Sequence, residues 1–191
     1  MRHLKLFESF DDSDQNYHFP NEFIIDGVDE VFREYPELEG IGTKQAYSRY
    51  LETVFPDSKI KDIVYHSSPS KFSKFKDPAS SGLSHIWFSE KPLEGQFGSN
   101  IYSVLLDLQN PLTEDNPDYR RELEFFEVPL NPDWANNYHK TGELPRFKYD
   151  GTIRLSRVDG GKSITVRNPE QIHILGSEED IEGFIQYSKK G

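Results

Sequence analysis

Three short apolar runs in this chain are each interrupted by polar or aromatic side chains that could take part in chemistry. They are residues 63–68, 84–89 and 168–175, which carry His66, then Trp87 and Ser89, and then Glu170 and Gln171. The runs are far apart in the sequence, so these side chains can meet only if the runs become neighbouring strands. The pattern therefore predicts a site built from adjacent strands of a sheet rather than from one contiguous loop.

Several other kinds of site lack the residues that they need. The chain has no cysteine, which excludes disulfides, thiolate zinc sites and cysteine nucleophiles. Four histidines, His66, His85, His139 and His173, do not have the short spacing of zinc ligands, so no metal site is predicted. Gly160-Gly161 is interpreted as a turn rather than a phosphate loop, because no helix follows it. The Gly-x-Ser-x-Gly elbow of serine hydrolases is also missing.

Composition favours one acidic, soluble domain. The 191 residues carry 33 acidic and 22 basic side chains, a formal charge of −11, and 14% are aromatic, enough for a substantial core. This charge repels polyphosphate backbones, so a protein acceptor or partner is favoured over nucleic acid. No apolar stretch approaches the roughly 18 residues that span a bilayer, and the first residues lack the apolar segment of a signal peptide. We therefore expect a soluble protein with no membrane partner.

Helices are expected near both ends of the chain. Apolar residues after Asp26 suggest a helix that Pro36 ends, and Thr43 is a candidate N-cap for a second helix that Pro56 ends. Residues 178–187 form an expected C-terminal helix, and residues 91–98 a short irregular one. The strand pattern covers six segments: residues 62–66, 85–89, 101–108, 149–155, 163–166 and 171–175. Gly160-Gly161 is the expected hairpin turn between two of them.

The predicted organisation is one domain with an arm. Residues 1–16 form an N-terminal arm or leader, and residues 17–191 form the domain. Within the domain, residues 17–57 are a helical lead-in and residues 113–148 are a long polar insertion resembling a lid.

Five stretches, in order along the chain, resemble ADP-ribosyltransferase-like proteins of phage genomes and, more remotely, poly(ADP-ribose) polymerases and diphtheria toxin. They are residues 47–57 leading into 61–66, then 86–89, 110–112, 149–151 and 168–172, and the likeness covers residues 44 to about 184. The resemblance implies an α+β fold with N-terminal helices and two small, mostly antiparallel sheets that face each other across an NAD-binding cleft.

The resemblance also implies roles for individual residues. His66 would hydrogen-bond a ribose hydroxyl of NAD, and backbone groups of Ser67 would hold the nicotinamide amide, at a place where many relatives have glycine. Trp87 stands at the family's usual tyrosine and offers a flat face to the nicotinamide ring, and Phe97 is placed to stack on it. Tyr65, Phe88 and Ser89 flank these positions and are also expected to contact NAD.

The third family position falls on Glu170 or on Gln171. Alignment with the polymerases makes Glu170 the catalytic glutamate, whereas phage-type relatives point to Gln171. Because successive strand residues face opposite ways, only one of the two would face the cleft. A carboxylate there would stabilise the oxocarbenium-like ribose that forms as nicotinamide leaves, whereas an amide would orient the sugar without neutralising its charge.

The function expected from the resemblance is an NAD-dependent mono-ADP-ribosyltransferase, encoded by a phage, that modifies a host macromolecule. It would act in the host cytoplasm or be packaged in the virion, where Leu6-Phe7-Glu8 fits the Leu-x-Glu tripeptide cut by prohead proteases. Two alternatives stay open: an NAD glycohydrolase, and a virion or interaction protein that keeps the fold without turnover. Each residue also has a structural interpretation: His66 bonded to nearby backbone, Trp87 in the core and Glu170 in solvent.

Overall fold

The computed structural model describes residues 24–78, 85–117, 119–120, 149–156 and 160–190. The predicted arm, residues 1–16, and most of the predicted insertion, residues 113–148, therefore lie outside the described residues.

The described α-helices begin and end where the sequence signals place them, and a 3-10 helix that the sequence did not indicate follows the first of them. They are α1 (Val28–Glu34), the 3-10 helix η1 (Pro36–Gly40), α2 (Lys44–Val54) and α5 (Glu178–Ser188). The Thr43 side chain accepts a hydrogen bond from the Ala46 N–H at 3.2 Å, and Ser177 caps α5 in the same way. The three predicted α-helices on these segments are confirmed, whereas no helix forms over residues 91–98, a segment that is described in full.

The strands form one mixed, mostly antiparallel sheet. They are β1 (Val64–Ser68), β2 (Ile86–Ser89), β3 (Asn100–Leu106), β4 (Pro111–Thr113), β5 (Gly151–Ser156), β6 (Gly161–Val166) and β7 (Ile172–Ile174). Their order is β4-β5-β6-β2-β1-β3-β7, and only the β4–β5 pair is parallel. The six predicted strands are present, and β5 and β6 pair as the expected hairpin, with Ser156 opposite Gly161.

The sheet is continuous, which corrects the expectation of two separate sheets, but it has a weak seam. The β1–β3 pair has five residue pairs in register and the β2–β6 pair has four. Across the seam, β1 and β2 share only the pair Tyr65–Ser89. Ser89 is the last residue of β2, so the rest of β2 makes no ladder pair with β1, and the sheet divides into a β2-side half and a β1-side half.

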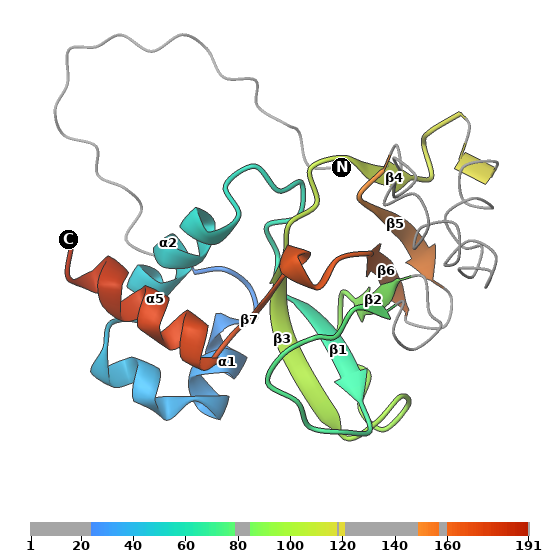
Figure 1. Ribbon diagram of the computed structural model, residues 1–191. Helices are drawn as coiled ribbons and strands as arrows, with labels where there is room; N and C mark the ends of the chain where they lie inside the picture. Colours follow the sequence, from blue (N-terminus) through green and yellow to red (C-terminus); the bar gives the residue numbers. More distant parts are fainter. Residues whose placement is uncertain (1–23, 79–84, 118, 121–148, 157–159, 191) are drawn as a thin grey trace, which may run out of the picture.

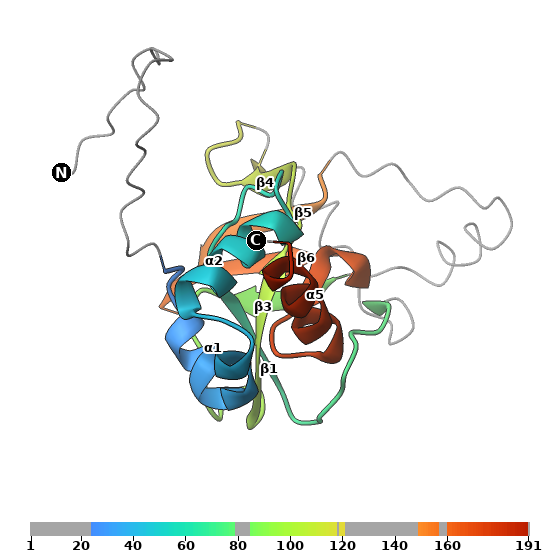
Figure 2. The same ribbon diagram turned by 90° about the vertical axis from the view of Figure 1, so that its left-hand side faces the viewer.

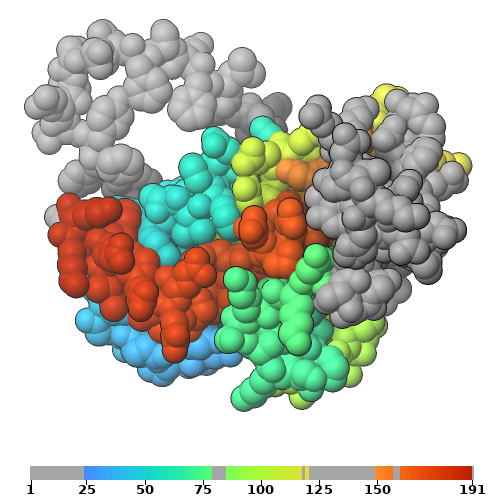
Figure 3. Space-filling view, viewed as in Figure 1, coloured from blue at the N-terminus to red at the C-terminus, as the bar shows by residue number. Residues whose placement is uncertain are grey.

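Side-chain alternation along the strands builds two separate cores. Leu105 packs with α1, α2 and α5 on one face of β3, and its neighbour Val104 packs on the other face with Ile86, Phe88 and Ile164. Figure 1 shows the three helices together on the β7 side of the sheet, and in Figure 2, turned by 90°, they lie in front of it. The helices thus cover the β1-β3-β7 half only. In the space-filling view their blue, cyan and red surfaces adjoin one another (Figure 3).

Candidate functional site

A pocket of about 360 Å³ lies at the seam between β1 and β2. Its lining residues are Tyr65, His66, Ser67, Trp87, Phe88, Ser89, Leu93, Phe97 and Ser163. The volume is within the range of small-molecule sites. All seven residues that the family resemblance assigned to NAD contact line this pocket, and Leu93 and Ser163 are additions that the sequence did not indicate.

Hydrogen bonds to backbone carbonyls fix the pocket walls where the strand ladder is interrupted. The His66 Nδ1 atom lies 2.8 Å from the carbonyl oxygen of Trp87 and bridges the seam. Ser67 Oγ donates to the Leu93 carbonyl at 3.2 Å, and Ser89 Oγ donates to the Lys91 carbonyl at 2.6 Å. Of these three bonds, only the one from His66 joins β1 to β2; the Ser67 bond ties β1 to the segment after β2, and the Ser89 bond is local to that segment.

The His66 imidazole has one defined tautomer. A carbonyl oxygen only accepts hydrogen bonds, so Nδ1 must carry the proton and Nε2 is left as an acceptor in the neutral ring. Four aromatic rings surround the imidazole with centroids 5.1 to 6.4 Å away: Phe72, Phe75, Phe88 and Tyr102. Burial among these rings lowers the pKa of His66, and the bond to the Trp87 carbonyl opposes this only in part. His66 is therefore a neutral hydrogen-bond acceptor at pH 7.

Two exposed aromatic side chains supply flat apolar surface at the pocket. Trp87 is 38% exposed and Phe97 is 53% exposed, although large aromatic residues are usually well buried. The core interpretation of Trp87 is therefore wrong. Gly98 holds the segment carrying Phe97 against the end of β1, because it has φ +139° and an added Cβ would lie 2.1 Å from the Ser68 carbonyl carbon.

Glu170 and Gln171 are not part of this pocket, which corrects their assignment as the third catalytic position. They lie in a 3-10 turn, η3 (Pro169–Gln171), before β7, so the strand alternation used to choose between them does not apply. The distance of Gln171 from His66 can be followed along β3. Gln171 lies beside Asp107, whose N–H donates to the Gln171 carbonyl, and His66 lies beside Tyr102, its partner in the β1–β3 ladder. Asp107 and Tyr102 are five residues apart. At a strand rise of about 3.3 Å this offset alone is roughly 16 Å, and β3 lies between β7 and β1.

The Gln171 side chain links three backbone segments through hydrogen bonds. Its Oε1 accepts from the backbone N–H groups of Arg167 and Asn168, and its Nε2 donates to the carbonyls of Asp107 and Asp150 at 2.9 and 3.1 Å. These four bonds join the end of β6, the end of β3 and the start of β5. The Glu170 side chain is exposed.

Replacing Gln171 by alanine is expected to lower the free energy of unfolding by about 2–3 kcal/mol, because partly buried backbone groups lose their partners. The same change should leave ligand binding at the β1–β2 pocket within twofold. Urea denaturation and calorimetry measure the two effects, with Glu170→Ala as the neighbouring control that changes neither. Loss of ligand binding by a folded Gln171→Ala protein would restore Gln171 to the site.

No carboxylate is found among the described residues that line the pocket. Glu90 directly follows Ser89, but its carboxylate accepts the Lys162 N–H at 3.1 Å and lies 3.4 Å from the Lys162 ammonium. No described residue that lines the pocket therefore supplies the carboxylate that would stabilise a positively charged sugar. The described residues also include no group of three side chains suited to a metal ion.

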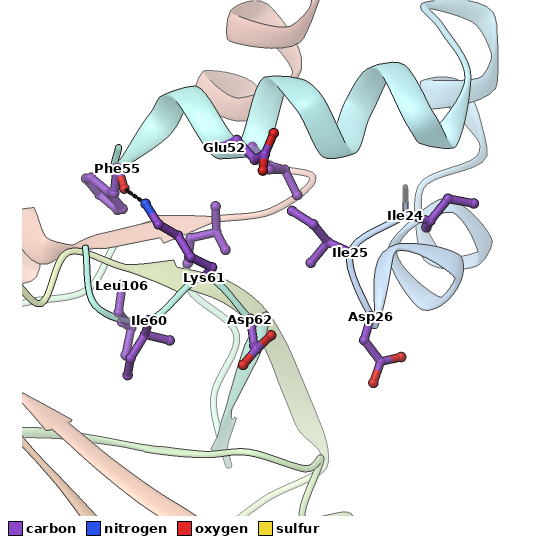
Figure 4. Close-up of a pocket in the computed structure, with 11 residues that line it drawn as sticks. Ile24, Ile25, Asp26, Glu52, Phe55, Ile60, Lys61, Asp62 and Leu106 are labelled. Atoms are coloured by element: carbon purple, nitrogen blue, oxygen red, sulfur yellow. Dashed lines mark hydrogen bonds between the residues drawn. The ribbon is translucent and has the colours of Figure 1, made fainter. Parts of the chain in front are cut away.

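A second pocket, of about 250 Å³, lies between α2 and the segment leading into β1 (Figure 4). Lys61 crosses it and donates from Nζ to the carbonyls of Phe55 and Pro56 at 2.9 and 2.6 Å. Three carboxylates, those of Asp26, Glu52 and Asp62, belong to its lining, so its field is unfavourable for a phosphate group. None of the predicted site residues lines it.

Three comparisons of the whole chain, with models of known protein families, with curated proteins and with solved structures, found no match. Among the described helices none is long and apolar enough to cross a membrane. The structural evidence on function is therefore the geometry of the β1–β2 pocket.

Proposed function

We propose that the β1–β2 pocket binds NAD through its nicotinamide riboside half, and that the chain is an NAD-dependent mono-ADP-ribosyltransferase with a protein acceptor. The observation that carries this proposal is the meeting of His66, Ser67, Trp87 and Phe97, from three separate segments, around one pocket. The seven residues to which the resemblance to ADP-ribosyltransferase-like proteins gives a role in NAD contact all line that single hollow.

The pocket chemistry suits the nicotinamide riboside group. The nicotinamide ring of NAD is flat and positively charged, and aromatic faces such as those of Trp87 and Phe97 attract cations. A neutral His66 adds no competing charge, and its Nε2 atom can accept a hydrogen bond from a ribose hydroxyl. Polar backbone groups near Ser67 are suited to the carboxamide. These features together support recognition of the ring, the amide and the sugar.

In the transfer reaction the bond between C1′ of the ribose and the nicotinamide nitrogen breaks, and the electron pair leaves with nicotinamide. The ribose becomes oxocarbenium-like, and a nucleophile on the acceptor forms the new bond to C1′ while losing a proton. Nicotinamide is a good leaving group, so fixing the sugar against His66 and the ring against Trp87 supplies acceleration through orientation. Without a lining carboxylate this positioning is the main contribution of the described residues.

A second function, NAD binding without turnover, is favoured by one specific observation. None of the described lining residues is a carboxylate; of the two glutamates that directly follow a lining residue, Glu90 is paired with Lys162 and Glu94 is exposed. Electrostatic stabilisation of the developing charge is commonly the largest single contribution to catalysis of this kind. An interaction protein that senses NAD would need the recognition groups alone.

Incubation of the protein with NAD labelled in its adenylate half, with and without a bacterial lysate, tests the proposal. Label transferred to lysate proteins supports the transferase, and free labelled ADP-ribose without acceptor identifies a glycohydrolase. Saturable NAD binding with neither product identifies a non-catalytic NAD-binding protein. The absence of calorimetric NAD binding at millimolar concentration contradicts all three.

Affinity for NAD should depend on pH through His66. Burial lowers the pKa of His66, so the ring is neutral at any pH above the ordinary histidine pKa. The affinity for NAD should therefore be constant from about pH 7 to 8. As the pH falls through the lowered pKa, the imidazolium that forms repels the cationic nicotinamide ring, and affinity should fall up to tenfold per pH unit. Calorimetry between pH 5 and 8 measures this, with ADP-ribose, which lacks the cationic ring, as the less affected control ligand. An NAD affinity that stays flat while the His66 ring becomes protonated would contradict the role given to His66.

A further inference from the structure

The pocket between α2 and the segment leading into β1, here called the α2 pocket, has an apolar floor (Figure 4). Leu105 belongs to the core under the helices and Leu106 to the core on the other face of β3, and both line this pocket. The pocket therefore lies where the two cores meet. Ile25 and Leu51 are buried beside it, and Ile24, which is 38% exposed, extends the apolar surface to the solvent. A hollow of about 250 Å³ with such a floor favours the apolar part of a ligand.

The opening of the α2 pocket is negatively charged. Asp26, Glu52 and Asp62 line it from three different segments, and all three residues are exposed. Within the described part of the chain, none of these carboxylates makes a hydrogen bond or an ion pair. Lys61 is the one cation among the described lining residues, and its ammonium group already donates to two carbonyls at the end of α2, where a helix favours positive charge. The uncompensated charge at the opening is therefore negative.

A negative opening above an apolar floor selects an organic cation. It opposes carboxylates and phosphates, because their charge has the same sign. A bound metal ion is not indicated, since the described residues include no group of three side chains that could hold one. The volume of the hollow is just below the usual range of ligand sites, so the apolar body of the ligand must be small, such as a short alkyl chain. A primary amine of this kind can place its ammonium group at the carboxylates and its chain in the hollow.

We propose that the α2 pocket binds a small, free primary amine with an alkyl body, with the ammonium group at Glu52 and Asp62 and the chain against Leu51 and Leu105. The site is separate from the proposed NAD pocket, because the two linings share no described residue. The two pockets also differ in charge, since the described lining of the β1–β2 pocket includes no acidic or basic side chain other than the neutral His66. Exposed ion pairs contribute little, so the apolar chain should supply most of the affinity, which we expect in the millimolar range.

Backbone amide shifts measured by NMR on the full chain, during titration with butylamine, hexylamine and octylamine at neutral pH and low salt, test the proposal. We expect saturable shifts at residues 51–52, 60–62 and 105–106, and unchanged shifts at residues 87–89 of the other pocket. Affinity should rise about threefold to fourfold for each added methylene until the hollow is full. Hexanol, which lacks the charge, should bind several times more weakly than hexylamine, and hexanoate should not bind saturably. Added salt should reduce the preference for hexylamine over hexanol.

A double variant removes charge at the opening without changing the apolar floor. Glu52→Gln combined with Asp62→Asn should weaken hexylamine binding about threefold to tenfold and leave hexanol binding within twofold. Both positions are exposed, so the variant should melt like the wild type. Glu39→Gln, at an exposed glutamate of η1 outside the lining, is the matched control and should change neither affinity.

The outcomes that overturn the inference are distinct from those that bear on NAD. Amine shifts that do not saturate, or that gather away from the α2 pocket, overturn the site. Hexanoate that binds as well as hexylamine, or a folded double variant that binds hexylamine within twofold of the wild type, overturns its preference for a cation. Failure of NAD to bind the same protein would leave the amine site standing, and failure of the amines would leave the proposed function standing.

Discussion

Replacing His66 by alanine is expected to weaken NAD binding about a hundredfold and to remove any transfer of ADP-ribose. The substitution deletes the Nε2 acceptor proposed for the ribose hydroxyl, and it leaves the Trp87 carbonyl without its 2.8 Å partner across the seam. Together these losses amount to about 3 kcal/mol, and each 1.4 kcal/mol is a factor of ten in affinity. Calorimetry gives the affinity, and labelled NAD gives the transfer.

His66→Asn separates the two contributions. The asparagine amide is positioned to donate to the Trp87 carbonyl in place of Nδ1, so the seam is kept, but the Nε2 acceptor and the ring are lost. We expect this variant to unfold at nearly the wild-type temperature and still to bind NAD at least tenfold more weakly. An asparagine variant that binds NAD like the wild type would show that His66 only joins the strands.

The largest effect on stability is expected from Asp180→Ala. Asp180 is 0% exposed. Its carboxylate lies 2.8 Å from His173 Nε2 and accepts hydrogen bonds from the Gly176 N–H at 2.8 Å and from the Tyr47 hydroxyl. Burial, followed by the charge of Asp180, raises the pKa of Tyr47, so its hydroxyl stays protonated and donates. Alanine leaves these buried donors without partners, which should lower the free energy of unfolding by about 3–5 kcal/mol.

Urea denaturation measures this loss, and the melting temperature should fall by roughly 10 °C for a domain of this size. Glu179→Ala is the matched control, because Glu179 is the preceding residue in the first turn of α5 and its side chain is exposed. Its change should stay within about 0.5 kcal/mol. The remaining folded Asp180→Ala protein should bind NAD normally, since this network joins α2, β7 and α5 on the helical side. A loss below about 1 kcal/mol would contradict the account of this buried cluster.

Local signals were sufficient for most elements of the fold. Thr43 with Pro56, and the apolar run ended by Pro36, located α2 and α1 because caps and prolines act within a few residues. Alternating side chains located β1 and β2, and Gly160-Gly161 located the β5–β6 hairpin. The pocket followed from these, since it lies where β1 meets β2.

The positions of Glu170 and Gln171, the expected third part of the site, could not be predicted from local signals. Pro169 opens a turn whose Asn168 and Gln171 cap each other, and a proline at a first helical position is a signal for such a turn that strand alternation overlooks. Ser163 reaches the pocket through the pairing of β6 with β2. That pairing depends on contacts between distant segments, which a local pattern does not specify.

The claim on which the account depends is that the seam between β1 and β2 is an NAD pocket. Backbone amide chemical shifts measured by NMR while NAD is added test it most directly. We predict saturable shifts at residues 65–67, 87–89 and 97, with smaller shifts at Ser163. Shifts that gather instead around Lys61 and Glu52 in the pocket beside α2, or no shifts at millimolar NAD, would contradict it.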